Sequence, residues 1–469
     1  MPANALPRTE EKPPTFDDLR GQIQADIFSH LPERLDRLSW DAGRLRVLQR
    51  DRLRALLRQV RQRSAFHAER LRAVDPDQFE VSDLTSLPVM TKADMMAQFD
   101  RLVTDPRLTR AAAERALQQT STEPVPMAGG FLCMATGGSS GQRGIFAYDA
   151  AGTAEVATMI FRNRIAALAA MAGTDAATAP VPNTTIAMVG APSAVHGTMF
   201  IPSIMAGSPI SFVHVPVTLP VPEIVSRLNR LQPDAVFGYP SMLARLAAEQ
   251  QARHLAIAPK LVNCTAETLL PAFRVAIKAA FGAPVMNTFA TSEGLIGSSG
   301  LNEEFITLGT DGCIVEPVDD CYRPVPPGTA SARVLVTNLY NHLQPLIRYE
   351  LSDSFTRQAD SDAHGHMRVT VDGRSDAILR YPGAEVHPLA LRSVLLTTPE
   401  VLDYQATQTV HGISVSVLLE RPADLRRLED RLRTAMVRAG LAGPHVEVQE
   451  VASLPRHPET GKLRRVVPA

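Results

Sequence analysis

The chain has 469 residues, and its 48 lysine and arginine residues nearly balance 49 aspartate and glutamate residues. This length predicts two or three domains and a core large enough to fold without disulfide bonds. A net charge of −1 excludes a global attraction to nucleic acid or to an anionic membrane. The four cysteines form no C-x-x-C pair, so a thiolate zinc site is not indicated.

The first 15 residues are polar and proline-rich, and we expect them to form a disordered tail. They hold no apolar core of a signal peptide, and no run of 18 or more apolar residues follows, so we expect a cytoplasmic protein. Residues 16–75 are predicted to be helical, because apolar residues recur at helical spacing between 53 and 60. Thr91 is predicted to cap a further helix that begins at Lys92.

From about residue 130 the chain alternates between short apolar runs and helical stretches, which predicts an α/β fold with largely parallel sheets. The predicted strands are residues 186–189, 235–237 and 284–286. The predicted helices between them are residues 223–231 and 241–250. Residues 315–349 carry more strand signals and prolines, which is typical of a small β subdomain.

A second, shorter alternation of helix and strand patterns follows Gly373-Arg-Ser-Asp376. Its predicted elements are helices at 388–396 and 423–439 and a strand at 413–419. Together they make a compact α+β module of roughly 90 residues, an ordinary size for a small domain. We therefore expect an N-terminal domain at 16–373, a hinge at 374–376 and a C-terminal domain at 377–469.

The stretch Ala135-Thr-Gly-Gly-Ser-Ser-Gly-Gln-Arg-Gly144 combines four glycines with three hydroxyl residues. Such a loop can surround phosphate with backbone N–H groups, although a plain turn is also compatible with it. It lacks the Gly-Lys-Ser/Thr of a Walker loop. Its G-x-S-x-G spacing also fits a serine hydrolase that uses Ser139. That reading needs a strand-to-helix turn, whereas the β-like runs on both sides predict a hairpin.

Several further segments follow in a fixed order, and together they resemble the adenylate-forming superfamily, in its phenylacetate–CoA ligase-like branch. The resemblance covers the chain from about residue 85 to the C-terminus. The segments that carry it are Thr136 to Gly144, Val195-His-Gly197, Gly238-Tyr-Pro-Ser241, Thr265-Ala-Glu267, Phe289-Ala-Thr-Ser-Glu293, Arg348-Tyr-Glu-Leu-Ser-Asp353, Gly373-Arg-Ser-Asp376, and Leu454-Pro-Arg456 with Gly461-Lys462.

This resemblance implies an enzyme that uses ATP to convert a carboxylic acid, an aromatic one in this branch, into an acyl-adenylate and pyrophosphate. The acyl group would then pass to CoA. ATP, Mg²⁺ and CoA are the implied cofactors and co-substrates. The implied partners are the small-molecule acid and CoA or another acyl acceptor, with a homodimer left open and neither nucleic acid nor a membrane expected.

The resemblance also implies roles for single residues. Lys462, one of only five lysines, would meet the reacting carboxylate oxygen and the α-phosphate, and Glu293 would bind Mg²⁺. Asp376 would be the hinge between two poses of the C-terminal domain. The residues implied to bind ATP are Thr136, Gly138, Ser139, Ser140, Gly141, Ala266, Glu267, Phe289, Ser292, Asp353 and Arg374.

Other assignments keep two readings. His196 would line the acyl pocket and gate the second step, or be a buried histidine with satisfied hydrogen bonds. Tyr239 would border the acyl pocket or pack in the core. The cluster Asp360, Asp362, His364 and His366 invites a metal site, but its spacing favours a polar hairpin loop.

The chain also departs from the family pattern, which puts the substrate in question more than the ATP chemistry. Gly144 stands where many relatives have a loop lysine, and Phe289-Ala290 replaces Tyr-Gly. The further departures are Glu350, Ser352 and Ala377. Two other functions stay open. One is an enzyme of the same fold that passes the adenylate to an amine or a carrier protein, or activates nitrite for diazotisation of an aromatic amine. The other is a serine hydrolase.

Overall fold

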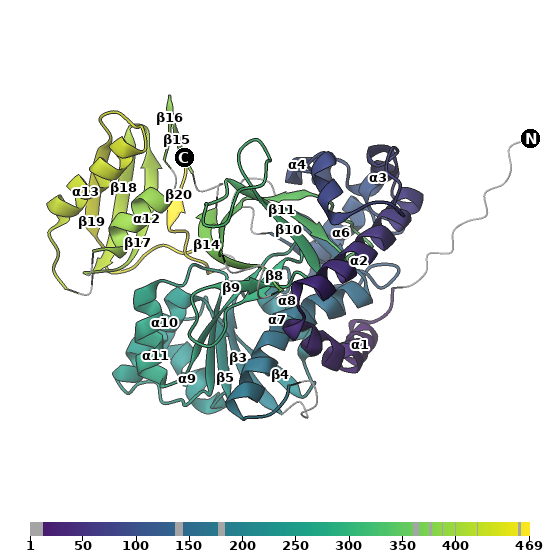
Figure 1. Ribbon diagram of the computed structural model, residues 1–469. Helices are drawn as coiled ribbons and strands as arrows, with labels where there is room; N and C mark the ends of the chain where they lie inside the picture. Colours follow the sequence, from purple (N-terminus) through teal and green to yellow (C-terminus); the bar gives the residue numbers. More distant parts are fainter. Residues whose placement is uncertain are drawn as a thin grey trace, which may run out of the picture.

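The computed structural model of this chain describes residues 13–136, 144–176, 183–359, 365–374, 378–386, 388–398, 400–419, 421–457 and 461–469. Figure 1 shows a large body with a central sheet and, beside it, a smaller C-terminal body drawn in yellow-green. None of the helices in the described ranges combines the length and the apolar character needed to cross a membrane.

Helices at the start of the chain form a layer against the large body (Figure 1). Side-chain caps begin most of them: Thr15, Asp41 and Ser64 each accept a backbone N–H of the following turn. The helices are α1 (Phe16–Asp36), α2 (Ala42–Arg63), α3 (Ala65–Arg70), α4 (Lys92–Ala97), α5 (Phe99–Leu102) and α6 (Arg110–Gln119), with 3₁₀ turns η1 (Arg37–Ser39) and η2 (Val81–Ser86). The predicted helical segment and the Thr91 cap of α4 are confirmed.

The Gly-rich stretch connects two antiparallel strands. β1 (Leu132–Ala135) pairs with β2 (Ile145–Tyr148), and helix α7 (Ala150–Met171) begins only after β2. At the base of the loop, the N–H of Thr136 donates to the carbonyl of Gly144 at 3.0 Å, and the N–H of Gly144 donates to Thr136 Oγ1 at 2.9 Å. The predicted hairpin is confirmed, so the strand-to-helix turn of a serine hydrolase is not formed here.

A nine-stranded sheet with the order β13-β14-β9-β8-β7-β6-β5-β3-β4 forms the centre of the large body. Its strands are β3 (Thr184–Gly190), β4 (Ile210–Pro216), β5 (Ala235–Gly238), β6 (Leu261–Thr265), β7 (Val285–Ala290), β8 (Ile296–Ser298), β9 (Ile306–Leu308), β13 (Asp353–Arg357) and β14 (Arg368–Arg374). β4, β3, β5, β6 and β7 pair in parallel, and the remaining pairs are antiparallel. The predicted α/β class with a largely parallel sheet is confirmed.

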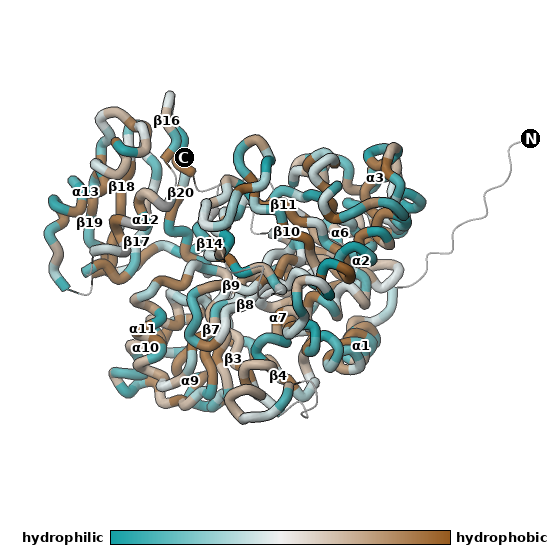
Figure 2. Tube along the Cα trace, in the orientation of Figure 1, coloured by the Kyte–Doolittle hydropathy of each residue, from teal (hydrophilic) through white to brown (hydrophobic). Residues whose placement is uncertain are grey.

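Helices cover both faces of the parallel part of this sheet, as its apolar strands require. Ile186 and Met188 of β3 belong to one hydrophobic cluster with α1, α7 and α8 (Gly197–Met205). Ala187 and Val189, which point the other way, belong to a second cluster with α9 (Val221–Leu231), α10 (Pro240–Gln251) and α11 (Pro271–Phe281). Figure 2 shows hydrophobic residues concentrated along these strands.

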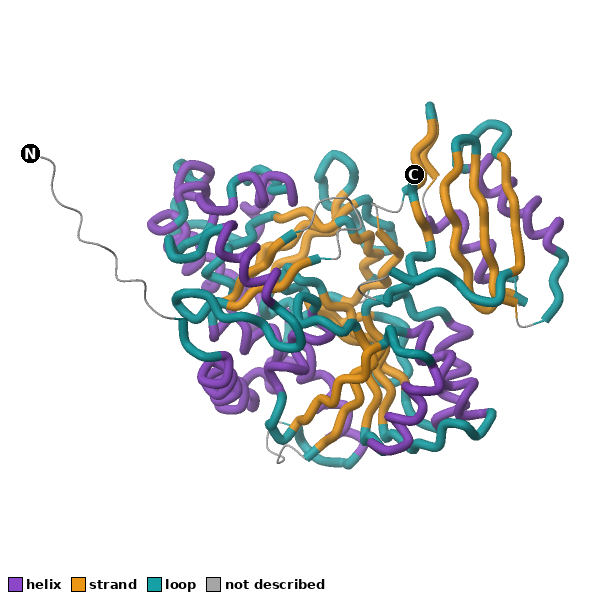
Figure 3. The backbone as a smooth tube through the Cα atoms, turned by 180° about the vertical axis from the view of Figure 1, so that it is seen from behind, coloured by secondary structure: helices purple, strands orange, loops and turns teal. Residues whose placement is uncertain are grey.

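The remaining elements form a small β subdomain and the C-terminal body (Figure 3). The subdomain is a three-stranded sheet of β10 (Cys313–Val318), β11 (Arg333–Asn338) and β12 (Tyr349–Leu351), as predicted. The C-terminal body has its own hydrophobic cluster. Its elements are β15 (Leu379–Tyr381), β16 (Ala384–Val386), α12 (Pro388–Leu396), β17 (Val401–Thr409), β18 (Gly412–Leu419), α13 (Leu425–Arg438), β19 (His445–Glu450) and β20 (Val466–Val467). The sequence pattern predicts α12, β18 and α13, whereas β17 and β19 are not predicted from it.

A buried ion pair joins α7 to the loop before β10. The two terminal nitrogens of Arg162 donate to the two carboxylate oxygens of Asp311 at 2.6 Å each, and both side chains are at most 1% exposed. Burial alone would raise the pKa of Asp311, but the charge of Arg162 and its hydrogen bonds hold that pKa below its usual value. Asp311 Oδ2 also lies 3.9 Å from Arg37 Nη1, so the pair belongs to a larger group of buried charges.

His67 makes stability depend on pH. Its ring is fully buried on α3, with Nε2 3.1 Å from the carbonyl of Pro345, and burial lowers its pKa to about 3. The folded chain therefore keeps His67 neutral, whereas the unfolded chain binds a proton below pH ~6.5. Above pH ~6.5 the protonation of His67 does not lower the free energy of unfolding. As the pH falls from ~6.5 toward 3, this free energy declines, by about 2 kcal/mol at pH 5.

We therefore expect His67→Gln to reduce the difference in unfolding free energy between pH 7.5 and pH 5 by about 2 kcal/mol. Urea unfolding at both pH values measures this difference. The matched control is His411→Gln, at an exposed position, which should leave the difference as in the unsubstituted chain. An equal pH dependence in the unsubstituted chain and His67→Gln would contradict the prediction.

Candidate active site

The parallel strands bring distant segments to one edge of the sheet. His196 follows β3, Tyr239 follows β5, Glu267 follows β6 and Glu293 follows β7. Because these strands run in the same direction, their carboxyl ends share an edge, which is where open α/β sheets bind their ligands. Four of the segments singled out in the sequence therefore meet at this edge.

The hairpin that carries the Gly-rich loop is attached to the same edge by both of its strands. The N–H of Ala135 donates to the carbonyl of Val195 at 2.9 Å, directly before His196. On the other strand, the hydroxyl of Tyr148 donates to the carbonyl of Ser292 at 2.7 Å. The hairpin thus lies beside the segments after β3 and β7. The loop residues Gly138, Ser139, Ser140 and Gly141 lie outside the described residues.

Three side chains hold the backbone around Glu293. The carbonyls of three successive residues each accept a hydrogen bond from one of these side chains, at 2.7–3.0 Å. The pairs are Tyr148 with Ser292, Asn338 with Glu293, and Tyr340 with Gly294. None of these three donors is predicted from the sequence. Each comes from another element, and a polar side chain in a strand or loop carries no signal for such a distant partner.

The carboxylate of Glu293 lies in a setting that suits a metal cation. The residue is 6% exposed, and no cationic side chain among the described residues forms an ion pair with it. Burial raises the pKa of Tyr148 well above its usual value, and the charge of Glu293 raises it further, so the tyrosine stays a hydrogen-bond donor. A buried carboxylate oxygen without a counter-ion is a fitting ligand for Mg²⁺.

Asp353 and Arg374 lie opposite each other on neighbouring strands of the sheet. Asp353 begins β13, Arg374 ends β14, and the two are direct partners in the antiparallel register. Two residues after Asp353, the ring of Phe355 packs edge-on against Phe289 with ring centres 5.3 Å apart. The strand that carries the predicted ribose residue therefore contacts the predicted adenine residue through Phe355, which their separation in sequence did not show. Their roles toward ATP stay predictions.

The C-terminal segment with Lys462 reaches this edge as well. The N–H of Leu463 donates to Glu267 Oε1 at 2.8 Å, so the residue next to Lys462 is bonded to the loop after β6. Ala266, in the left-handed region with φ 65°, makes the turn that leads into Glu267. The side chain of Glu267 is 1% exposed and bonded within the protein. The ATP contact implied for Ala266 and Glu267 stays a prediction.

The remaining predicted residues have mixed outcomes. His196 is buried at the start of α8. Tyr239 is fully buried, its hydroxyl lies 3.3 Å from Thr198 Oγ1, and burial raises its pKa to about 12. This packing agrees with the core reading of Tyr239, and the acyl-pocket roles of both residues stay predictions. Asp376 lies outside the described residues.

The described part of the metal-like cluster has a structural role. His366 is buried, with Nδ1 3.1 Å from Thr310 Oγ1 and Nε2 2.9 Å from the carbonyl of Arg37. Both ring nitrogens are thus occupied by protein atoms. Asp360, Asp362 and His364 lie outside the described residues, and within the described ranges no group of three acidic, histidine or cysteine side chains could hold a metal ion.

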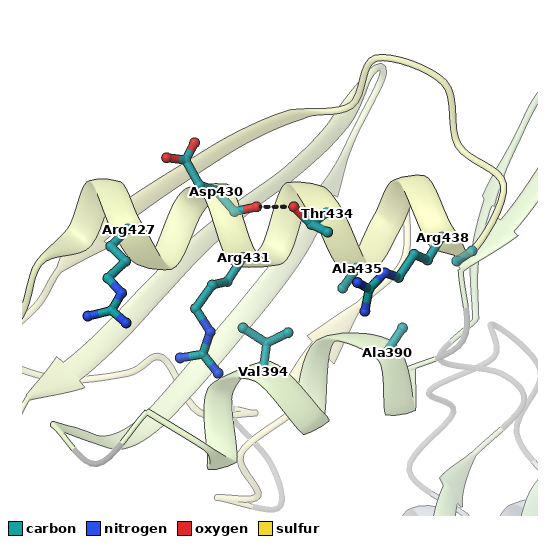
Figure 4. Close-up of a pocket in the computed structure, with 9 residues that line it drawn as sticks. Ala390, Val394, Arg427, Asp430, Arg431, Thr434, Ala435 and Arg438 are labelled. Carbon is teal, nitrogen blue, oxygen red and sulfur yellow. Dashed lines mark hydrogen bonds between the residues drawn. The ribbon is translucent and has the colours of Figure 1, made fainter.

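The C-terminal body carries a basic groove of about 690 Å³ between α12 and α13. Figure 4 shows the arginines of α13 pointing toward the helix that bears Val394 and Ala390. The arginines in the lining are Arg427, Arg431 and Arg438. None of the predicted site residues lines this groove, so it is separate from the edge where they meet.

Comparison with known proteins finds partial sequence relatives of this chain. No protein-family model matches the chain. Two curated relatives match in part. Protein CapK of Staphylococcus aureus is 24% identical over 45% of this chain and 47% of its own length. Phenylacetate-coenzyme A ligase of Thermus thermophilus is 28% identical over 38% of this chain and 43% of its own length. Each match thus spans less than half of the relative.

Solved structures match over nearly the whole chain. 2-Hydroxyisobutyryl-CoA ligase in its postadenylation state, bound to R3-HIB-AMP, superposes with a TM-score of 0.69 over 92% of this chain and 91% of its own, at 16% identity. The chain has the fold of the adenylate-forming CoA ligases. In an open conformation the same ligase gives a TM-score of 0.59, at 17% identity over 92% of this chain and 93% of its own. In the thioesterification state it gives a TM-score of 0.57, at 16% identity over 92% of this chain and 91% of its own. The resemblance found in the sequence motifs is thereby confirmed at the level of the fold.

Within this fold, Gly294 is expected to tolerate no side chain. It has φ 95°, and a Cβ atom there would collide with Tyr340 Oη and Asn338 Nδ2. Gly440 has φ 96°, but a Cβ atom added there would have nothing within 4 Å, so this position isolates the backbone strain. Both Gly→Ala substitutions should cost stability through the positive φ, by about 1 kcal/mol.

We expect Gly294→Ala to cost a further 1–3 kcal/mol, roughly the penalty of overpacking a tight site. Chemical unfolding of Gly294→Ala and Gly440→Ala measures this difference directly. Equal destabilisation of the two variants would show that the contacts around Glu293 do not form as described.

Proposed function

We propose that this chain is an ATP-dependent ligase that adenylates a carboxylic acid, releases pyrophosphate and then transfers the acyl group to CoA. One observation carries the proposal: the segment with Lys462 is bonded to the same sheet edge at which the Gly-rich hairpin and the Glu293 loop meet. A cation from the C-terminal body and a carboxylate from the large body at one edge suit chemistry on a nucleotide and a carboxylate.

The reaction would proceed by attack of a carboxylate oxygen on the α-phosphorus of ATP. The new P–O bond forms as the bond to pyrophosphate breaks, which makes AMP the leaving group in the second step. Lys462 would contribute positive charge where negative charge gathers on the attacking oxygen and the α-phosphate. Asp353, with Arg374 opposite it, would orient the ribose, and Phe289 would stack on adenine.

Glu293 would hold Mg²⁺, whose charge offsets that of the phosphates when it is bound. Its buried carboxylate and its fixed backbone support this assignment. The Gly-rich loop would add backbone N–H groups and the hydroxyls of Ser139 and Ser140 as phosphate donors. Thr136 already uses its hydroxyl to accept the N–H of Gly144, so it would shape the base of the loop.

The arrangement of the two bodies supports the adenylation step in particular. The TM-score is higher against the postadenylation state of 2-hydroxyisobutyryl-CoA ligase than against its open or thioesterification states. We propose that the C-terminal body moves about a hinge at 374–376, with Asp376 as its pivot, to reach a second pose for transfer to CoA. The partial match to a phenylacetate-coenzyme A ligase supports an aromatic acid as the substrate.

A pyrophosphate-release assay over aliphatic and aromatic acids tests this function. Each acid is assayed with CoA, with an amine, with a carrier protein and without acceptor, and nitrite replaces the acid in a parallel series. Acid-dependent pyrophosphate release followed by a CoA thioester is the expected result. Release without thioester formation would assign another acceptor, and the absence of ATP turnover with every acid would overturn the proposal.

Lys462→Ala is expected to slow acid-dependent ATP–pyrophosphate exchange by about 10²–10³-fold, because it removes one positioned charge from the transition state. The KM for ATP should change little, since the lost interaction forms mainly in the transition state. Lys278→Ala, at an exposed position on α11, is the control and should keep full activity. Equal exchange rates in the two variants would remove Lys462 from the mechanism.

A further inference from the structure

Glu267 lies at the centre of a contact between the large body and the Lys462 segment, defined here as residues 461–463. Its carboxylate is 1% exposed. Oε2 accepts the hydroxyl of Ser241 at 2.5 Å and the N–H of Ser241 at 3.3 Å, at the first turn of α10. Oε1 accepts the N–H of Leu463 at 2.8 Å. One carboxylate thus connects a helix N-terminus, which favours negative charge, to the backbone beside Lys462.

Arg456 completes this contact from the C-terminal body. Its Nη1 lies 3.6 Å from Glu267 Oε1 and donates to the carbonyl of Gly461 at 2.9 Å. Its Nη2 donates to the hydroxyl of Ser241 at 2.8 Å. The guanidinium therefore binds both the acidic loop of the large body and the residue before Lys462. The peptide groups on the two sides of Lys462 are held by one charged pair.

The backbone of the Lys462 segment packs closely against the large body at Gly461. Gly461 has φ 64°, and a Cβ atom there would collide with Val217 of the large body. Further along, Arg465 pairs with Asp403 at 2.8 Å and donates to the carbonyl of Thr268 at 3.4 Å. Thr268 follows Glu267 in the same loop, so this loop is the part of the large body that receives the segment.

We infer that Glu267 is a positioning residue, which places the Lys462 segment for adenylation through the N–H of Leu463 and through Arg456. This inference rests on the proposed function and adds a role that differs from a contact with adenine. The bonds to Glu267 exist only while the C-terminal body lies in this arrangement. Loss of Glu267 should therefore impair the step that uses Lys462 and spare a step carried out in another arrangement.

The first test separates the two half-reactions in the full-length chain. Adenylation is followed by ATP–pyrophosphate exchange, and transfer by thioester formation from a chemically prepared acyl-adenylate and CoA. Glu267→Ala should lower the kcat of exchange by about 10–100-fold, the effect of misplacing a reacting group by roughly an ångström. The KM for ATP and the transfer rate should stay within about 2-fold, because neither depends on the lysine's placement.

Two further variants calibrate this result. Glu267→Gln keeps an oxygen that can accept the N–H of Leu463, so its loss of exchange activity should be smaller than that of Glu267→Ala. Glu249→Gln removes a carboxylate from the same helix, α10. The carboxylate of Glu249 bonds to His254 at the surface, so both half-reactions should be unchanged. A Glu267→Ala variant with normal exchange, or with equal losses in both half-reactions, would overturn the inference.

The second test asks whether Glu267 acts through Lys462. In a Lys462→Ala background, Glu267→Ala should cause no additional loss of exchange activity, since residues that act as a unit are not additive. An additional loss, or a rise in the KM for ATP, would overturn the positioning role and favour the contact with adenine.

The third test needs no activity and separates failure of the inference from failure of the proposed function. In hydrogen exchange without substrate, peptides that cover residues 461–465 should exchange faster in Glu267→Ala than in the unsubstituted chain and in Glu249→Gln. Unchanged exchange would refute the contact even if the enzyme adenylates acids. Faster exchange in a chain that turns over no ATP would confirm the contact and refute the proposed function.

Discussion

The parallel pairing of β3, β5, β6 and β7 is the constraint on which the rest of this structure depends. Parallel neighbours must be linked by crossover connections, and these bury both faces of the sheet under helices. Because the strands run in the same direction, their carboxyl ends all lie at one edge. The loops after these strands then converge without any local affinity for each other. The hairpin of β1 and β2 and the C-terminal segment need only dock at that edge to complete the site.

Polar contacts rather than apolar packing set the fine geometry at this edge. Three side-chain donors hold the carbonyls around Glu293, and one carboxylate, Glu267, receives the backbone beside Lys462. Hydrogen bonds to buried groups are directional, and an unmade one costs about 1–3 kcal/mol, so they favour a single position. The C-terminal body has its own core, and its contacts with the large body include polar ones made by Arg456, Leu463 and Arg465.

Departures from the family pattern become understandable in three dimensions. Glu350 accepts the hydroxyl of Tyr322 at 2.6 Å and lies 3.5 Å from Arg333, so it serves the small β subdomain. Gly144 closes the base of the hairpin loop through reciprocal bonds with Thr136. Each of these two residues thus has a structural role of its own in this chain.

Local signals in the chain were enough to predict the α/β class, the hairpin, most helices and the order of the motifs, because periodicity, caps and turn residues act between near neighbours. Among the strands they missed are β4 and β6 of the large sheet and β17 and β19 of the C-terminal body. Three further features depend on the tertiary structure: Asp353 faces Arg374, Asn338 and Tyr340 hold the Glu293 loop, and Glu267 receives Leu463. These contacts join residues far apart in the chain, and strand order, register and domain docking, rather than any local propensity, bring them together.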